Sequence, residues 1–178
     1  MSEGADEMAQ AADRRHSHSH NQSLEHSPSH GQAHHPNPPP TDPDPTVWLV
    51  DQVTGRSHAF SPAELAALPA TVLNACFIQS TGHPSSGPFR FSGVRLLDLI
   101  RHAGSDTSML QRVEVVSVDG FGVRLSRAEL ESDPRILLAL TIEDRPLARD
   151  AGLVRLIVPS ETTEALKQVK WVRTIELV

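Results

Sequence analysis

Apolar and polar positions change their spacing several times between residues 47 and 178, and each change predicts an element. Alternating patterns and short apolar runs predict strands, because successive side chains of a strand point to opposite faces. The strands expected in this way cover residues 47–53, a short stretch ending at Phe60, and residues 71–78, 113–118, 121–125, 153–158 and 169–177. The apolar run 136–142 fits either a strand or a short helix, because periodicity alone does not separate the two.

Short helices are predicted by two capping boxes and by one helical spacing. The sequence SPAE at residues 61–64 places a hydroxyl at the N-cap, proline at the first helical position and a carboxylate at the third, which favours a helix over residues 63–68. Residues 126–129 (SRAE) repeat the hydroxyl and the carboxylate. Helical spacing over residues 94–101, closed by Gly104, predicts a further helix.

The connections between these elements complete the predicted fold. Asp119-Gly120 fits a two-residue hairpin turn. Residues 79–88 (QSTGHPSSGP) are predicted to form a loop after a buried strand, a place where functional side chains are often found. Residues 161–167 fit a helical turn or a mobile loop. Together the pattern predicts one compact α+β domain over residues 47–178, with mostly antiparallel or mixed strands and short helices.

The first 46 residues differ from the rest in composition. They hold seven acidic and two basic residues and seven of the ten histidines, and Leu24 is their only Leu, Ile, Val or Phe. Such a segment buries too little apolar surface to offset the entropy of ordering, so we expect a disordered tail over residues 1–46. Its histidines can bind zinc, nickel or copper transiently, and a solvated linker explains the same composition, so both interpretations stay open.

Charge and motif content exclude several classes of protein. The formal net charge of −6 argues against binding to nucleic acid. The start of the chain lacks the apolar run of a secretory signal, and no window approaches the roughly 20 apolar residues of a membrane span, so we expect a cytoplasmic protein. A single cysteine excludes an intramolecular disulfide and Cys-rich zinc or iron–sulfur sites. Dinucleotide-binding, P-loop and GxSxG motifs do not occur.

Several short motifs follow one another in a characteristic order. They are the opening LVDQVTGRSHAFSPAELAALP at 49–69, a strand with Cys76, GVRLLDLIRHAG at 93–104, Asp-Gly at 119–120, LLA at 137–139, RPL at 145–147, GLVRLIVP at 152–159 and VKW at 169–171. This order resembles the molybdopterin-binding domain of the sulfite oxidase family of oxidoreductases, in a short stand-alone form. The resemblance extends over residues 47–178 and agrees with the predicted α+β domain.

The resemblance implies a cofactor and a site. In the family the cysteine thiolate ligates molybdenum, which makes Cys76 the expected metal ligand and catalytic residue, and a soft thiolate suits this metal. The expected contacts to molybdenum-molybdopterin, including its phosphate, come from Ser80, Thr81, Gly82, His83, Arg155 and Lys170. The implied activity is two-electron oxo transfer on a small oxyanion or an S- or N-oxide, with an external electron donor or acceptor.

Several of these residues, and Trp171 beside Lys170, also have a simpler interpretation. Cys76 fits a small buried apolar residue, and Arg155 and Lys170 fit exposed charges on strand edges. His83 fits a loop histidine that only bonds its neighbours, and Trp171 fits the core.

Two other functions therefore stay open. The first is a non-catalytic module that keeps the fold and binds a pterin-like ligand, a metal or a protein partner. It is favoured by FIQS at residues 77–80 and by Ala151, which replace residues of the larger enzymes of the family. The second is a cysteine hydrolase, in which His58, His83 or His102 would act as base for the Cys76 thiol.

Overall fold

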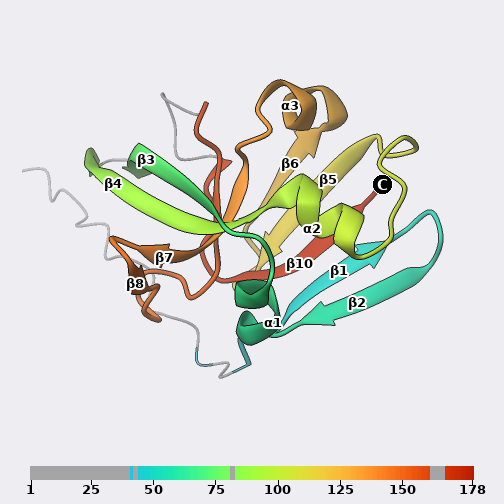
Figure 1. The fold of residues 1–178 in the computed structure, drawn as a ribbon, viewed down its shortest axis with the longest axis horizontal. Coiled ribbons are helices and arrows are strands. Elements are labelled where there is room, and N and C mark those ends of the chain that lie inside the picture. Colours follow the sequence, from blue (N-terminus) through green and yellow to red (C-terminus); the bar gives the residue numbers. More distant parts are fainter. Residues whose placement is uncertain (1–40, 42–43, 81–82, 161–166) are drawn as a thin grey trace, which may run out of the picture. The chain divides into compact units, whose positions relative to one another are not determined.

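Two five-stranded sheets form the framework of the domain (Figure 1). The computed structural model describes residues 41, 44–80, 83–160 and 167–178, with the backbone alone described at 79–80 and 83–85. Almost all of the predicted tail, with its seven histidines, and most of 161–167 lie outside the described residues.

The first sheet has the strand order β2-β1-β10-β5-β6. Its strands are β1 (Val47–Asp51), β2 (Arg56–Phe60), β5 (Arg112–Ser117), β6 (Gly122–Ser126) and β10 (Val172–Leu177). The β1 and β10 strands pair in parallel, and every other pair in this sheet is antiparallel. The first and last strands of the domain thus lie side by side.

The second sheet carries the long hairpin that contains the cysteine. Its order is β3-β4-β7-β8, and β9 also pairs with β7. The strands are β3 (Thr71–Ser80), β4 (His83–Arg95), β7 (Leu137–Ile142), β8 (Arg145–Pro146) and β9 (Arg155–Ile157), all paired in antiparallel fashion. The run 136–142, open between strand and helix in the sequence, is therefore a strand.

Three short helices connect the strands: α1 (Pro62–Ala67), α2 (Leu96–His102) and α3 (Arg127–Ser132). Both predicted capping boxes are confirmed. The Glu64 amide donates to Ser61 Oγ at 3.2 Å, and the Ser61 amide donates to Glu64 Oε2 at 2.8 Å. Ser126 and Glu129 repeat these two bonds at the start of α3, which satisfies amides that a helix otherwise leaves open.

A large apolar core joins the first sheet to the helices and to one face of the second sheet. It contains inward residues of β1, β5 and β10, such as Leu49, Val113 and Ile175, which are fully buried. The helices add Leu99 and Leu130. We call this group of buried residues the main core. The predicted α+β class with mixed strands is confirmed.

One predicted connection is wrong, and a second is longer than predicted. Most of the stretch 79–88 is strand rather than loop, because β3 continues to Ser80 and β4 starts at His83. Cys76 pairs with Phe89 while Ile78 pairs with Ser86, so β4 holds one extra residue there. Such a bulge accommodates the glycine and proline between them, which made this stretch look like a loop in the sequence.

The Asp119-Gly120 connection is longer than the predicted two residues. Val116 pairs with Gly122, and the Ser117 amide donates to the Phe121 carbonyl at 2.8 Å. The Asp119 carboxylate accepts the Phe121 amide at 3.1 Å, so it stabilises the turn as a local acceptor. The predicted hairpin is confirmed, with a wider turn.

Candidate functional site

Cys76 lies in β3, at an irregular point of the hairpin with β4. The register of the pairing shifts between Leu73 and Cys76, and Ala75 has a positive φ of 55°. A Cβ added to Gly87 would lie 2.8 Å from the Cys76 carbonyl oxygen, so the backbone of β4 approaches the cysteine as closely as only glycine allows. The backbone around the cysteine is thus held by both strands of the hairpin.

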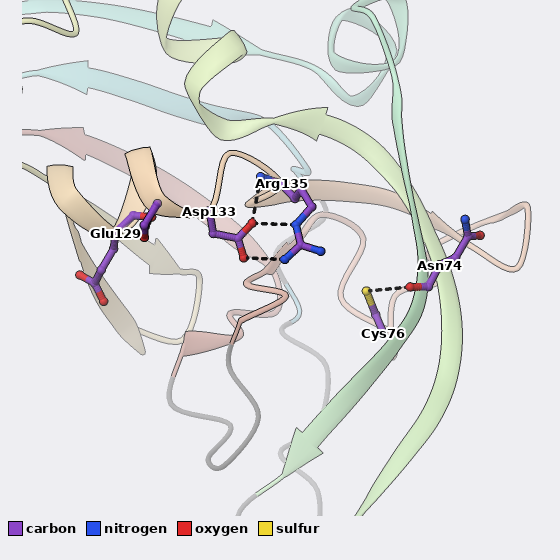
Figure 2. Close-up of polar contacts among 6 residues, drawn as sticks. Asn74, Cys76, Glu129, Asp133 and Arg135 are labelled. Atoms are coloured by element: carbon purple, nitrogen blue, oxygen red, sulfur yellow. Dashed lines mark hydrogen bonds and ion pairs between the residues drawn. The ribbon is translucent and has the colours of Figure 1, made fainter.

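The thiol itself faces a small cluster of buried residues on the second sheet. Cys76 is 9% exposed, and Sγ is placed to donate to the Asn74 carbonyl oxygen at 3.9 Å, as Figure 2 shows. The other buried members of this cluster, which we call the cysteine cluster, are Leu73, Phe91, Leu137, Ala139, Leu147 and Ile157. Burial raises the pKa of the Cys76 thiol above its usual range, so the thiol is protonated at neutral pH.

A charged pair next to the cysteine modulates its thiol. Asp133 accepts two hydrogen bonds from the Arg135 side chain, from Nε at 3.0 Å and from Nη2 at 3.3 Å (Figure 2). Burial acts to raise the pKa of Asp133, but the bonds from Arg135 outweigh it and the net pKa lies below the usual range. The charge of Arg135 favours a Cys76 thiolate and that of Asp133 opposes it. The Arg135 side chain is 62% exposed.

Arg155 points to the same face of the second sheet as the cysteine cluster. In the pairing of β7 with β9, Arg155 lies opposite Ala139, and Ile157 lies opposite Leu137. Ala139, Leu137 and Ile157 all belong to the cysteine cluster. Leu156 between them belongs to the main core, as strand alternation requires. Arg155 is only 5% exposed, and burial lowers its pKa to about 10.

The described polar contacts of Arg155 leave its Nε donor open. Its Nη2 donates to Gln168 Oε1 at 3.3 Å, and Gln168 Nε2 donates to the Phe77 carbonyl oxygen at 3.0 Å. Arg155 Nε is buried and has no hydrogen-bond partner among the residues that the structure describes. Because Phe77 follows Cys76 in β3, this chain of contacts connects the buried guanidinium to the strand of the cysteine.

Lys170 lies next to Arg155. Burial lowers the pKa of Lys170, the neighbouring charge of Arg155 lowers it further, and Asp150 opposes both. A Cβ on Gly152, whose φ is 113°, would lie 3.2 Å from Lys170 Cβ, so glycine allows this close approach. The Lys170 ammonium lies 5.6 Å from the ring centroid of Trp171, which is buried as predicted. Two cations therefore share one partly desolvated site.

The structure brings some of the expected site residues together. Arg155 and Lys170 interact, and Arg155 is connected to the backbone next to Cys76. The interpretation of Arg155 as an exposed charge on a strand edge is wrong, because its side chain is buried. Ser80 pairs with His83 through the backbone of β3 and β4. Thr81 and Gly82 lie outside the described residues.

Two residues of the site were missed in the sequence. Gln168 and Arg135 belong to none of the family motifs quoted above, and glutamine and arginine are common on protein surfaces. One signal was present for Gln168, because it stands immediately before the VKW motif at residues 169–171.

Other candidate chemistry lies elsewhere or has no support. Among the residues that the structure describes, no three His, Cys, Asp or Glu side chains form a group that could hold a metal. His58 and His102 lie on β2 and α2 with ring centroids 6.3 Å from that of Phe60, a main-core residue. No contact between either histidine and Cys76 is found, so the structure gives no base for a hydrolase thiol from these two.

The donor set fits a phosphate-bearing cofactor. Arg155 offers an open, buried N–H to an anion, and a guanidinium binds phosphate oxygens in a planar, bidentate geometry. A thiolate ligand also suits molybdenum, although here the thiol must lose its proton on metal binding. The residues present are thus compatible with the anionic group and with the metal.

Comparison with known proteins identifies the class to which this architecture belongs. Residues 37–178 match the family described as oxidoreductase molybdopterin binding domain, and the chain belongs to that family. The resemblance seen in the sequence motifs is therefore confirmed.

A solved structure shows the same fold in a longer chain. This chain is similar to "Sulfane Dehydrogenase SoxCD from Paracoccus pantotrophus", with a TM-score of 0.58 and 20% sequence identity. The match covers 74% of this chain and 37% of that chain, so the present sequence spans little more than a third of the neighbour's length. A search of curated proteins gave no match. No described helix is long and apolar enough to cross a membrane.

Proposed function

We propose that this domain binds molybdenum-molybdopterin and acts as a two-electron oxidoreductase, with Cys76 as metal ligand and catalytic residue. Arg155 and Lys170 bind the cofactor phosphate, and Ser80, Thr81, Gly82 and His83 contribute further donors. The observation that carries the proposal is the buried Arg155 guanidinium with an open Nε on the sheet face of the cysteine cluster.

The energetics of Arg155 support an anionic ligand. A guanidinium removed from water loses hydration, and this loss costs several kcal/mol unless an anion or hydrogen bonds compensate it. Among the described residues Arg155 has one bond of 3.3 Å to a neutral amide and no carboxylate partner. A bound phosphate monoester supplies the missing charge and the missing acceptor, so ligand binding and folding stabilise each other.

The chain contributes position and electrostatics. The molybdenum cofactor, when bound, supplies the two-electron oxo-transfer chemistry. Cys76 would give up its thiol proton and would hold the metal beside the mostly apolar cysteine cluster. Arg135, exposed and next to the thiol, favours its ionised form and attracts a small anionic substrate, such as an oxyanion, to the same side. The substrate class includes S- and N-oxides, and an external protein or small molecule exchanges the electrons.

One observation favours the alternative of a non-catalytic module. The Cys76 thiol is buried, and its pKa is raised rather than lowered. A pterin-like ligand held by Arg155 and Lys170 alone would leave the cysteine as a packing residue. The two functions differ in one measurable quantity, the molybdenum bound per chain.

The test is the metal and pterin content of protein purified from cells that make the cofactor and are supplied with molybdate. We expect about one molybdenum and one pterin per chain, and loss of molybdenum in Cys76→Ser. As a matched control, a variant with alanine at the seven histidines of residues 1–46 should keep its molybdenum. Pterin without molybdenum in the wild type would support the non-catalytic module. Absence of both, or metal that depends on the histidines alone, would refute the proposal.

A further inference from the structure

Gln168 is a buried polar side chain whose two ends are both bonded. It is 7% exposed and lies between Arg155 of β9 and Phe77 of β3, which are far apart in the sequence. Its Oε1 accepts from Arg155 Nη2 at 3.3 Å, and its Nε2 donates to the Phe77 carbonyl oxygen at 3.0 Å. The side chain thus bridges the anion-binding guanidinium and the strand that carries the cysteine.

The chemistry of the two partners makes an amide the suitable bridge. A guanidinium has donors only, and a backbone carbonyl has acceptors only, so the bridging group must accept at one end and donate at the other. A carboxylate cannot donate to the carbonyl, and a thioether cannot donate at all. The two bonds also fix the orientation of the amide, because the reversed orientation would place donor against donor.

The bridge determines which donors of Arg155 remain for a ligand. A long, flexible arginine side chain can turn its planar group in several directions, and bidentate recognition of a phosphate requires one of them. The bond at Nη2 restrains this rotation while Nε stays open. The bond to the Phe77 carbonyl oxygen fixes that orientation relative to the residue after Cys76. The phosphate-binding Arg155 and the metal-binding Cys76 are therefore held at a defined position relative to each other.

We propose that Gln168 is a positioning residue that orients Arg155 for phosphate and sets its place relative to Cys76. This inference rests on the proposed function in that Arg155 receives the phosphate of the cofactor. The inference extends the proposed site by Gln168, a residue outside all the sequence motifs. Gln168 acts through its hydrogen bonds to the Arg155 side chain and to the Phe77 carbonyl oxygen.

The test uses inorganic sulfate as probe, because its charge does not change between pH 4 and pH 8, and thermal unfolding of the full chain as readout. Three variants are compared with the wild type: Gln168→Glu, Gln168→Met and, as control, Gln52→Glu, which makes the same change at an exposed position of the first sheet's hairpin turn. Sodium chloride at equal ionic strength corrects for general salt effects.

We expect the melting temperature of wild type and Gln52→Glu to rise with sulfate. At pH 7 the Gln168→Glu carboxylate pairs with Arg155 and competes with sulfate, so its apparent affinity should fall roughly tenfold to hundredfold. The Gln168→Met variant keeps a side chain of similar shape but removes the hydrogen bond to the Arg155 guanidinium. Its affinity for sulfate should fall by a smaller factor. This variant also keeps the test valid if Gln168→Glu does not fold.

A pH profile separates positioning from a merely structural role. A protonated glutamic acid has one acceptor and one donor, as glutamine does, so the sulfate response of Gln168→Glu should recover as the pH falls through the pKa of the introduced carboxyl. Burial raises that pKa and Arg155 lowers it, so NMR of the carboxyl carbon follows its protonation directly. Gln168→Met and Gln52→Glu should show no such recovery. A sulfate affinity unchanged in both Gln168 variants, or a loss in Gln168→Glu that remains once its carboxyl is protonated, would overturn the inference.

The outcome is distinguishable from that of the proposed function. If the wild type contains neither molybdenum nor pterin but its sulfate response still depends on Gln168, the proposed function fails and the positioning role stands. If the wild type holds the cofactor and both Gln168 variants hold equal amounts with equal sulfate affinity, the function stands and the inference fails. No sulfate response in the wild type would overturn the inference as well.

Discussion

The main core and the cysteine cluster satisfy their buried groups in different ways. The main core is apolar throughout, and its fully buried residues come from both sheets and all three helices. The cysteine cluster contains a thiol with a raised pKa, and beside the cluster lie a guanidinium with an open Nε and a glutamine that bridges two strands. The main core has no polar group left to satisfy. Beside the cysteine cluster the Nε of Arg155 is buried without a bond among the described residues, and an unsatisfied buried donor of this kind is typical of a binding site.

The largest expected effect is a core truncation. Leu99 is fully buried in the main core, so Leu99→Ala should lower the free energy of unfolding by about 2–5 kcal/mol. Denaturant unfolding measures this loss. The exposed Val53→Ala serves as control and should change the free energy by less than about 0.5 kcal/mol. A small effect at Leu99 would contradict the assignment of the main core.

The second-largest expected effect is a gain in the free energy of unfolding, on substitution of Arg155. Arg155→Met replaces a buried charge by an apolar side chain of similar length, so the ligand-free protein should gain about 1–4 kcal/mol, as found when buried charges are replaced by apolar groups. The same variant should lose its stabilisation by sulfate. The exposed Arg145→Met is the matched control and should change neither property. Destabilisation by Arg155→Met in the absence of anions would show that the guanidinium is satisfied within the chain.

The smallest expected effect on stability comes from the carboxylate of Glu129, which lies outside the main core and the cysteine cluster. Hydrogen bonds from Lys167 and then from the Ser126 amide and hydroxyl lower the pKa of Glu129 to about 2. Because the folded pKa is depressed, the carboxylate stabilises the fold above its unfolded value near 4.5, and this contribution is lost as the pH falls towards 2.

Glu129→Gln should therefore cost about 0.5–1 kcal/mol at pH 7, a value reduced by solvent screening, and almost nothing near pH 2. Unfolding at both pH values measures the difference. An equal cost of Glu129→Gln at pH 7 and near pH 2 would refute the role of the capping box in holding this charge.

Much of the fold was predictable because local signals agree with the tertiary structure. The capping boxes of α1 and α3, the turn at Gly104 and the alternation of β5, β6 and β10 are each determined by neighbouring residues. The β3–β4 hairpin was mispredicted beyond Ile78, because pairing across a bulge overrides the local preferences of Gly87 and its neighbours.

The site was predictable only in part. The resemblance to the family pointed to Cys76, Arg155 and Lys170, because these residues belong to recognisable motifs. The burial of Arg155 and its contact with Gln168 depend on the pairing of β7 with β9 and on the position of β3, which no local pattern contains. Arg135 acts on the Cys76 thiol through its charge, and only the tertiary structure brings the two residues near each other.

The most direct test of the central claim is native mass spectrometry of the wild type and Arg155→Met, both purified from cells that make molybdopterin. We predict an added mass of one pterin cofactor on the wild type and its loss in Arg155→Met, while Arg145→Met keeps it. An unmodified mass for the wild type, or an equal cofactor load on Arg155→Met, would contradict the account.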